Sequence, residues 1–159
     1  MNKSQIPAAQ KDVLGLLLDD HKKAKVLFKD FEAEKSDTAK EEIARKVCME
    51  LTVHAAIEEE IFYPFLREQR PELFGDLLNE ALVEHATAKE LIAQIRGMSM
   101  KDDLYEAKVT VLGEYITHHI TEEEGELFPK VIEKKVDLRE ILTPMNERKE
   151  EMLHSAATA

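Results

Sequence analysis

Two stretches of the sequence repeat the same order of histidine, glutamate and proline: "HAAIEEEIFYP" at positions 54–64 and "HITEEEGELFP" at positions 119–129. In each stretch a glutamate follows the histidine by four residues, and a proline follows that glutamate by six. Residues four apart on an α-helix lie one turn apart on the same face. His54 with Glu58, and His119 with Glu123, can therefore each bind one metal ion.

Two further histidines extend this repeat. His21 precedes His54 by 33 residues, and His85 precedes His119 by 34 residues. The halves 1–70 and 71–135 then have the same order, a lone histidine followed by a His-x-x-x-Glu pair. Four inward histidines beside two glutamates would be costly to bury unless something paired them, and a metal would do so.

The ligand types also indicate how many ions could bind. If both glutamates bridge two metals, each metal receives two imidazole nitrogens and two carboxylate oxygens. A bridging oxide or hydroxide would be a fifth ligand and would leave one octahedral position open. Such mixed ligands suit iron, manganese or zinc, and open positions suit iron that meets oxygen. Ferritin-like di-iron proteins use Glu-x-x-His motifs instead, which this set does not resemble.

The elements that position these residues are expected to be helices, because glycine and proline are scarce, at five each, and apolar residues recur at helical spacing. Four long helices are predicted, of which the first covers residues 10–34 and the third covers residues 71–96. The second is capped by Ser36, Asp37 or Thr38, is kinked or ended by Pro64, and is closed by residues 68–71. The fourth is capped by Ser99 or Asp102 and runs to about residue 135. Short connections predict an all-α, antiparallel up-and-down four-helix bundle over residues 1–136. Residues 137–159 are expected to add a short helix at 144–153 and a frayed tail, with no chemistry assigned to them.

The bulk composition limits the function further. The chain has 159 residues, of which 43% are hydrophobic, enough for one compact domain with a core. A net charge of −11 disfavours nucleic acid and anionic membrane as partners. We expect a cytoplasmic protein, because no stretch has the apolar pattern of a signal peptide or a membrane span. The single cysteine, Cys48, excludes an internal disulfide framework and is expected to pack as a small hydrophobe.

Taken as a set, His21, "HAAIE", His85 and "HITEE" resemble the hemerythrin-like, or HHE cation-binding, domain over about residues 10–135. The resemblance implies an antiparallel four-helix bundle around a non-haem di-iron centre, with an oxo or hydroxo bridge, that reacts with O2, peroxide or NO. It also implies the role of each residue. The terminal ligands would be His21, His54, His85 and His119, and the bridging ligands would be Glu58 and Glu123.

One departure from that family affects the expected function. Oxygen-carrying hemerythrins have a fifth histidine one turn from the histidine of the third helix, whereas here the positions one turn from His85 are Ala81 and Lys89. Reactive or sensory uses of the centre are therefore favoured over reversible oxygen carriage. Whether the protein is an enzyme stays open. The alternatives are non-enzymatic iron or oxygen binding, storage, delivery or sensing, and a structural bundle without a resident metal.

Several residues near the motifs have both a functional and a plainer interpretation. Glu50 and Tyr115 could each add a metal ligand. In the plainer interpretation Glu50 is solvated and Tyr115 is a core residue. Phe62 and Leu127 could wall an apolar gas pocket, although ordinary core packing is the preferred interpretation. His118 and His154 are excluded as ligands. An acidic group is expected to form a solvated face: Glu59, Glu60, Glu122, Glu124 and Glu126.

Overall fold

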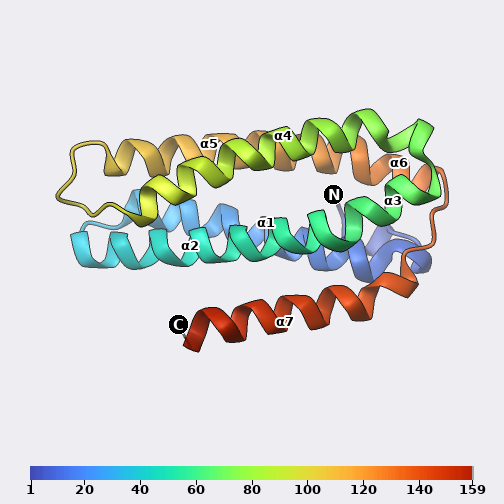
Figure 1. The fold of residues 1–159 in the computed structure, drawn as a ribbon, viewed down its shortest axis with the longest axis horizontal. Helices are drawn as coiled ribbons and strands as arrows, with labels where there is room; N and C mark the ends of the chain where they lie inside the picture. Colours follow the sequence, from blue (N-terminus) through green and yellow to red (C-terminus); the bar gives the residue numbers. More distant parts are fainter. Residues whose placement is uncertain (159) are drawn as a thin grey trace.

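The computed structural model describes residues 1–158, and over that range it is all-helical (Figure 1). The long helices are α1 (Ala8–Ala33), α2 (Asp37–Ile57), α4 (Pro71–Arg96), α5 (Tyr105–Glu122) and α7 (Leu142–Thr158). Shorter helical segments join or extend them: η1 (Lys3–Gln5), η2 (Glu58–Phe62), α3 (Tyr63–Gln69), η3 (Glu123–Leu127), α6 (Phe128–Glu133) and η4 (Arg139–Ile141). Within residues 1–158 no helix is apolar over a length sufficient to span a membrane.

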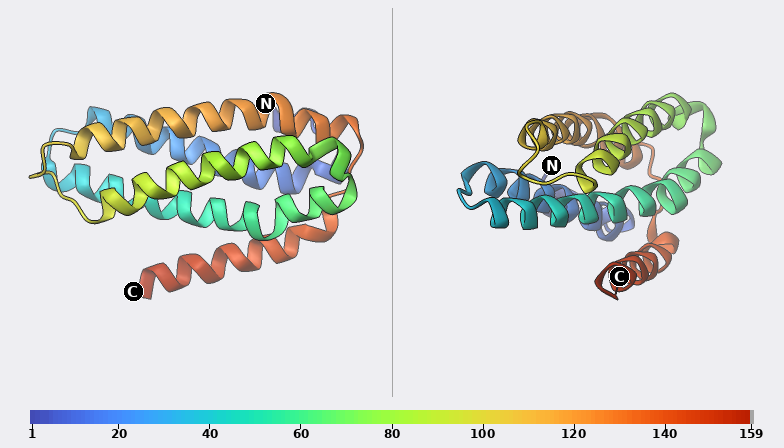
Figure 2. Two further views of the ribbon diagram at one scale, coloured as in Figure 1. Left: turned by 45° about the horizontal axis from the view of Figure 1, so that its top comes forward. Right: turned by 60° about the vertical axis from the view of Figure 1, so that its left-hand side comes forward.

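Four helical rods surround a common interior, and successive rods run in opposite directions (Figures 1 and 2). The rods are α1, α2 continued by η2 and α3, α4, and α5 continued by η3 and α6. Neighbouring rods pack as α1 with α2, α4 with α5, α1 with α5, and α2 with α4. This arrangement lets residues from all four rods meet at one level of the interior.

A fifth long helix, α7, lies outside these rods and runs along α2 (Figure 1). It has 17 residues, so the expected short helix at 144–153 is too short. The reason is packing: Met145 is fully buried, and Leu142 packs against the same apolar cluster. These contacts dock the first turn of the helix onto the rods, and hydrogen bonds from Arg148 to Glu60 and from Lys149 to Asp20 hold its middle.

The helix ends follow the predicted caps in part. The Ser36 side chain accepts a hydrogen bond from the Ala39 N–H at 3.3 Å, as expected for an N-cap. Gly97 ends α4. The prediction that Ser99 or Asp102 caps the next helix was wrong, because the Asp102 carboxylate instead accepts from the Ser99 N–H at 2.8 Å and closes a turn. The helix α5 then begins at Tyr105.

The two motif prolines, Pro64 and Pro129, do not end their helical rods, because helical structure continues through both residues. Each is preceded by one wide π-helical turn, in which the Tyr63 N–H bonds to the Glu58 carbonyl and the Phe128 N–H bonds to the Glu123 carbonyl. Proline lacks an N–H and crowds the carbonyl four residues earlier, and a wider turn accommodates both effects. Each wide turn begins at a motif glutamate, so it shifts the register of all residues that follow.

Two apolar clusters fill the interior, one on either side of the polar motif residues. The first, near the motif prolines, includes Leu17, Phe62, Leu66, Phe74 and Phe128. The second, toward the other end, includes Phe31, Val47, Cys48, Ile92 and Leu112. Cys48 is 1% exposed, which confirms its expected role as a small buried residue. The polar motif residues thus lie between two buried apolar clusters.

Candidate metal centre

The six residues singled out by the repeat converge in the interior, and none is more than 8% exposed. The helices α1, α2, α4 and α5 supply one histidine each, and the two π-helical turns supply the glutamates. The six are His21, His54, Glu58, His85, His119 and Glu123.

Their donor atoms form two groups that share Glu58. One group joins His21, His54, Glu58 and Glu123, the other joins Glu58, His85 and His119, and the donor atoms within each group lie within 4.8 Å of one another. Each glutamate lies between a histidine of one group and a histidine of the other.

The separations of individual atoms show this bridging position. Glu58 Oε1 lies 3.1 Å from His54 Nε2 and 3.3 Å from His85 Nε2. The two oxygens of Glu123 divide in the same way, with Oε1 3.1 Å from His21 Nε2 and Oε2 3.3 Å from His119 Nε2. All four Nε2 atoms therefore face carboxylate oxygens across a small interior space.

Several of these buried atoms have no hydrogen-bond partner despite their proximity. They are Nε2 of His21 and His54, both oxygens of Glu58, and Oε1 of Glu123. Nε2 of His85 and Nε2 of His119 face each other at 3.2 Å. Leaving such groups unpaired away from water is costly, and a cation would satisfy nitrogen lone pairs and carboxylate oxygens together. The donor set thus fits metal ions of the imidazole- and carboxylate-binding kind.

A second layer of carboxylates holds the other nitrogen of every one of these imidazoles. The Nδ1 atoms pair at 2.8–2.9 Å as follows: His21 with Glu124, His54 with Asp20, His85 with Glu59, and His119 with Glu84. A carboxylate accepts the Nδ1–H, so the Nε2 lone pair is directed inward. This is the arrangement that metal-ligating histidines use to fix their tautomer and orientation.

The prediction that Glu59 and Glu124 belong to a solvated face was wrong, because each bonds to a buried histidine on another helix. The repeat did carry a signal for this layer. An acidic residue precedes each lone histidine, and a second glutamate follows each motif glutamate, in both halves of the chain. The pairing is crosswise: each of these acids stands next to a motif histidine or glutamate of its own rod and bonds to a histidine of a neighbouring rod.

The charges around the imidazoles oppose the effect of burial. Burial alone would lower the pKa of His119, but the adjacent Glu123, with Glu58 and Glu84, raises that pKa to about 10. Burial would also raise the pKa of the Glu123 carboxyl, yet the hydrogen bonds from His119 and His21 hold it well below its usual value. The surroundings therefore favour positive charge between the helices.

Tyr63 is a buried member of the centre that the sequence did not single out. Its Oη donates to Glu123 Oε2 at 2.5 Å and lies 3.4 Å from His85 Nε2. Burial, followed by the charge of Glu123, holds the pKa of this phenol well above 10, so it keeps its proton. The wide turn explains the omission: it aligns the fifth residue after Glu58, which is Tyr63, rather than the fourth, Phe62.

The same position in the other half has no hydroxyl. Phe128, five residues after Glu123, stacks on His21 with ring centroids 5.8 Å apart. Tyr63 lies against His85 with centroids 5.5 Å apart. The two halves of the centre thus match in their histidines and glutamates and differ in one phenolic oxygen.

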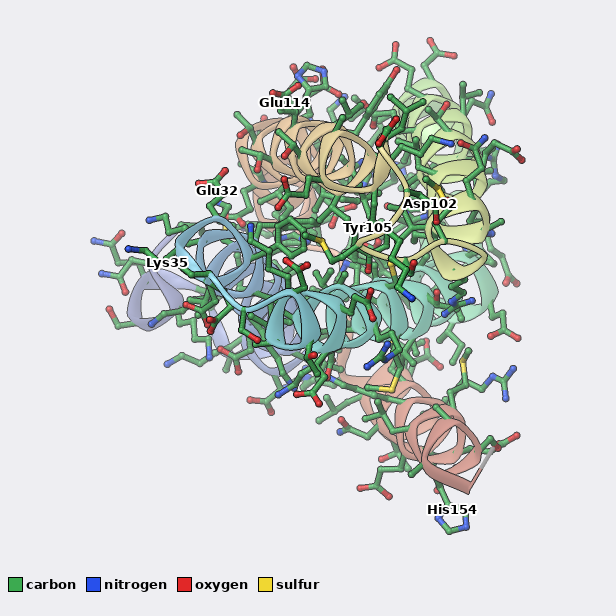
Figure 3. The ribbon with its side chains drawn as sticks, turned by 90° about the vertical axis from the view of Figure 1, so that its left-hand side faces the viewer. Glu32, Lys35, Asp102, Tyr105, Glu114 and His154 are labelled. Carbon is green, nitrogen blue, oxygen red and sulfur yellow. The ribbon has the colours of Figure 1, made fainter. Side chains whose placement is uncertain are left out.

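The two residues considered as extra ligands lie outside both donor groups. Tyr115 is 45% exposed, so it is neither core nor ligand. Glu50 is not solvated either, because its largely buried carboxylate pairs with Lys23 at 2.7 Å. His118 lies at the surface, 3.1 Å from Glu122. His154 lies on the far side of α7 from the rods (Figure 3).

A cavity of about 40 Å³ adjoins the histidines on the side away from the motif prolines. Its apolar walls include Ala24, Leu51, Ala88, Ile92 and Ile116. Phe62 is not among its lining residues but belongs to the core near the prolines, in agreement with the preferred interpretation of that residue. A volume of this size accommodates a molecule of a few atoms at most.

A smaller cavity, of about 20 Å³, lies beside Ala81, which is one of the two positions one helical turn from His85. Ala81, Leu127, His119 and Glu123 line it, so Leu127 does border a space at the centre. The Lys89 ammonium pairs with the Glu59 carboxylate at 2.6 Å and belongs to neither donor group. Neither Ala81 nor Lys89 supplies a further nitrogen ligand.

Comparisons with known proteins agree with this geometry. The family model described as "Hemerythrin HHE cation binding domain" matches residues 12–131. A curated protein named "DNA nickase" from Nostoc sp. is 30% identical over 112 residues, which is 70% of this chain and 31% of that relative. The chain thus matches about a third of the length of that relative. No solved structure matches significantly.

Proposed function

Since this chain belongs to the hemerythrin HHE cation-binding family, we propose that it is a non-haem di-iron protein whose centre binds or reacts with O2, peroxide or NO. Residues 12–131 would form the antiparallel four-helix bundle of that family. The proposal places the protein in the cytoplasm, with a small molecule as its ligand. The family implies binding of metal cations. The proposal goes further in naming iron as the metal, two ions as the number, and O2, peroxide or NO as the ligand or substrate.

The observation that carries this proposal is the pair of buried donor groups with Glu58 in common. His21 and His54 would hold one ion, and His85 and His119 would hold the other. Glu58 and Glu123 each face one histidine of either group, which supports a bridging role for both carboxylates. Unpaired Nε2 and carboxylate oxygen atoms support direct ligation rather than an internal hydrogen-bond network.

When bound, two iron ions would supply redox chemistry and open coordination positions. The residues around them perform the remaining tasks. The second-layer carboxylates keep a proton on each Nδ1, so every Nε2 remains a ligand. Tyr63 holds a proton at Oη beside Glu123 and can donate it to a small molecule bound near His85. The cavity of about 40 Å³ beside the histidines has room for a diatomic gas or peroxide but not for a large molecule.

Strand nicking, the activity in the name of the Nostoc relative, receives less support in this chain. The net charge of −11 would repel a phosphate backbone. The relative also has about two thirds of its length outside the match, which leaves room there for another activity. We therefore propose a small-molecule ligand for this chain and no nucleic-acid partner.

Metal analysis of the purified protein, combined with its optical spectrum, tests the proposal. We expect about two irons per chain and near-ultraviolet absorption typical of a bridged pair. One zinc per chain, or no metal, would contradict it. Turnover then separates the two alternatives: sustained consumption of peroxide or NO indicates an enzyme, whereas uptake that stops at one equivalent indicates a binding, storage or sensing protein.

A further inference from the structure

The C-terminal helix α7 reaches the second layer of the centre through one lysine. Lys149 Nζ donates to Asp20 Oδ1 at 2.5 Å, and the other oxygen of that carboxylate lies 2.9 Å from His54 Nδ1. We propose that Lys149 is a positioning residue, which fixes the Asp20 carboxylate and thereby the ring of the metal ligand His54. This inference rests on the proposed metal function of His54.

The environment of the Lys149–Asp20 pair makes the contact effective. The side chain of Asp20 is 9% exposed and that of Lys149 is 20% exposed, so water screens the pair only in part. Charge-assisted hydrogen bonds of this kind are short and directional. With both oxygens engaged, the Asp20 carboxylate cannot rotate without breaking one of the two bonds. The His54 ring is held in the same way through its Nδ1–H.

The contact is separable from the docking of the helix. Arg148, the preceding residue, bonds instead to Glu60 at 3.0 and 3.3 Å, and Met145 anchors the helix in the core near the prolines. Replacing Lys149 would therefore leave α7 attached along α2 (Figure 1). Arg148 is a matched control on the same helix, because its ion pair is with Glu60 of η2 and not with Asp20.

Of the four second-layer carboxylates, Asp20 is the one to which Lys149 of α7 donates a hydrogen bond. Glu59 has Lys89 of α4 as its cationic partner, and Glu84 lies 3.8 Å from His118 of α5. Loss of Lys149 would thus act on one histidine of the His21–His54 pair and leave the His85–His119 pair unchanged. The predicted effect concerns one of two ions, which makes it distinguishable from general loosening of the bundle.

Release of zinc to an excess of chelator tests the inference in the full chain loaded with two equivalents of Zn²⁺. In Lys149→Met, one of the two ions should leave about tenfold faster, the low end of the range for second-layer changes, while the other keeps its rate. Lys149→Arg should restore the slow release, and Arg148→Met should behave as the unmodified protein. Unchanged release from Lys149→Met, or equal acceleration in Arg148→Met, would overturn the inference.

A measurement on the metal-free chain keeps this test independent of the proposed function. With ¹⁵N-labelled histidine, the Nδ1–H signal of His54 should exchange slowly with solvent in the unmodified protein and in Arg148→Met, and rapidly in Lys149→Met. If the protein bound no metal, the proposed function would be wrong, but this signal would still show whether Lys149 holds the His54 ring in place. Equal exchange in all three proteins would refute a positioning role for Lys149.

Discussion

The hydroxyl of Tyr63 donates to Glu123 across the interior at 2.5 Å, joining the residue after one π-helical turn to the first residue of the other. The donor comes from the residue directly before Pro64, and the acceptor is the motif glutamate on the opposite pair of rods. Because Phe128 stands at the equivalent place in the other half, this single oxygen makes the two sides of the centre chemically different.

Replacement of Tyr63 by Phe should slow the reaction of the reduced protein with peroxide or O2 by about tenfold or more, because it removes the proton donor beside Glu123. Metal content should stay the same, since the six ligands remain. A phenylalanine, Phe128, already occupies the equivalent position in the other half of the chain. Stopped-flow absorbance measures the rate. Tyr115→Phe removes a hydroxyl at the surface and is the matched control; equal rates for Tyr63→Phe and this control would contradict a role for the phenol.

Adjacent histidines on α5 provide a test of the ligand set. His119→Ala removes an Nε2 that faces Glu123 at 3.3 Å, so the protein should lose about one of two metal ions. His118→Ala, which alters an exposed ring beside Glu122, should retain both. Elemental analysis after dialysis gives the content. Similar loss in both variants would mean that the two rings do not differ in their access to the metal.

The second layer can be tested at neighbouring glutamates. Glu59→Gln keeps the size of the side chain but weakens its bond to His85 Nδ1, so metal affinity should fall by about 10- to 100-fold. Glu60→Gln changes an adjacent, exposed carboxylate that pairs with Arg148, and should have little effect. Competition with a coloured chelator measures the metal affinity of both variants. Equal affinities would contradict the role of the second-layer carboxylates in metal binding.

Metal removal should lower the melting temperature. Without a cation, buried Nε2 and carboxylate oxygen atoms remain unpaired between the helices, and binding to the native state alone stabilises it by mass action. At a metal concentration 100 times the dissociation constant, the gain is about 2.7 kcal/mol. Scanning calorimetry of metal-free and reloaded protein measures the shift. Superimposable transitions would indicate a bundle that tolerates metal without depending on it.

Cys48 should resist thiol reagents in the native protein. Burial raises the pKa of its thiol to about 11, so at pH 8 the reactive thiolate is about one part in a thousand. In the unfolded chain the ordinary pKa of about 8.5 gives roughly a quarter thiolate. Alkylation by iodoacetamide should therefore be about two orders of magnitude slower in the native protein than in denaturant. Rapid native labelling would show that the second apolar cluster opens readily.

The sequence by itself determined the features that depend on local spacing. Helical periodicity is a property of neighbouring residues, so the repeated His-x-x-x-Glu pairs and the lone histidines were sufficient to select six residues that the structure brings together. The same spacing predicted the four rods of the bundle, but not the length of α7, and it indicated the family to which the chain belongs. It also correctly placed Cys48 among apolar neighbours.

Only the tertiary structure decided which residues from different helices meet. The bonds from Asp20 to His54 and from Glu59 to His85 cross between rods, and no periodicity within one helix specifies such partners. Tyr63 entered the centre because a wide turn before Pro64 shifted the register by one residue, which a regular helical repeat does not anticipate. Lys149 reached Asp20 over 129 residues because burial of Met145 docked α7 beside α2.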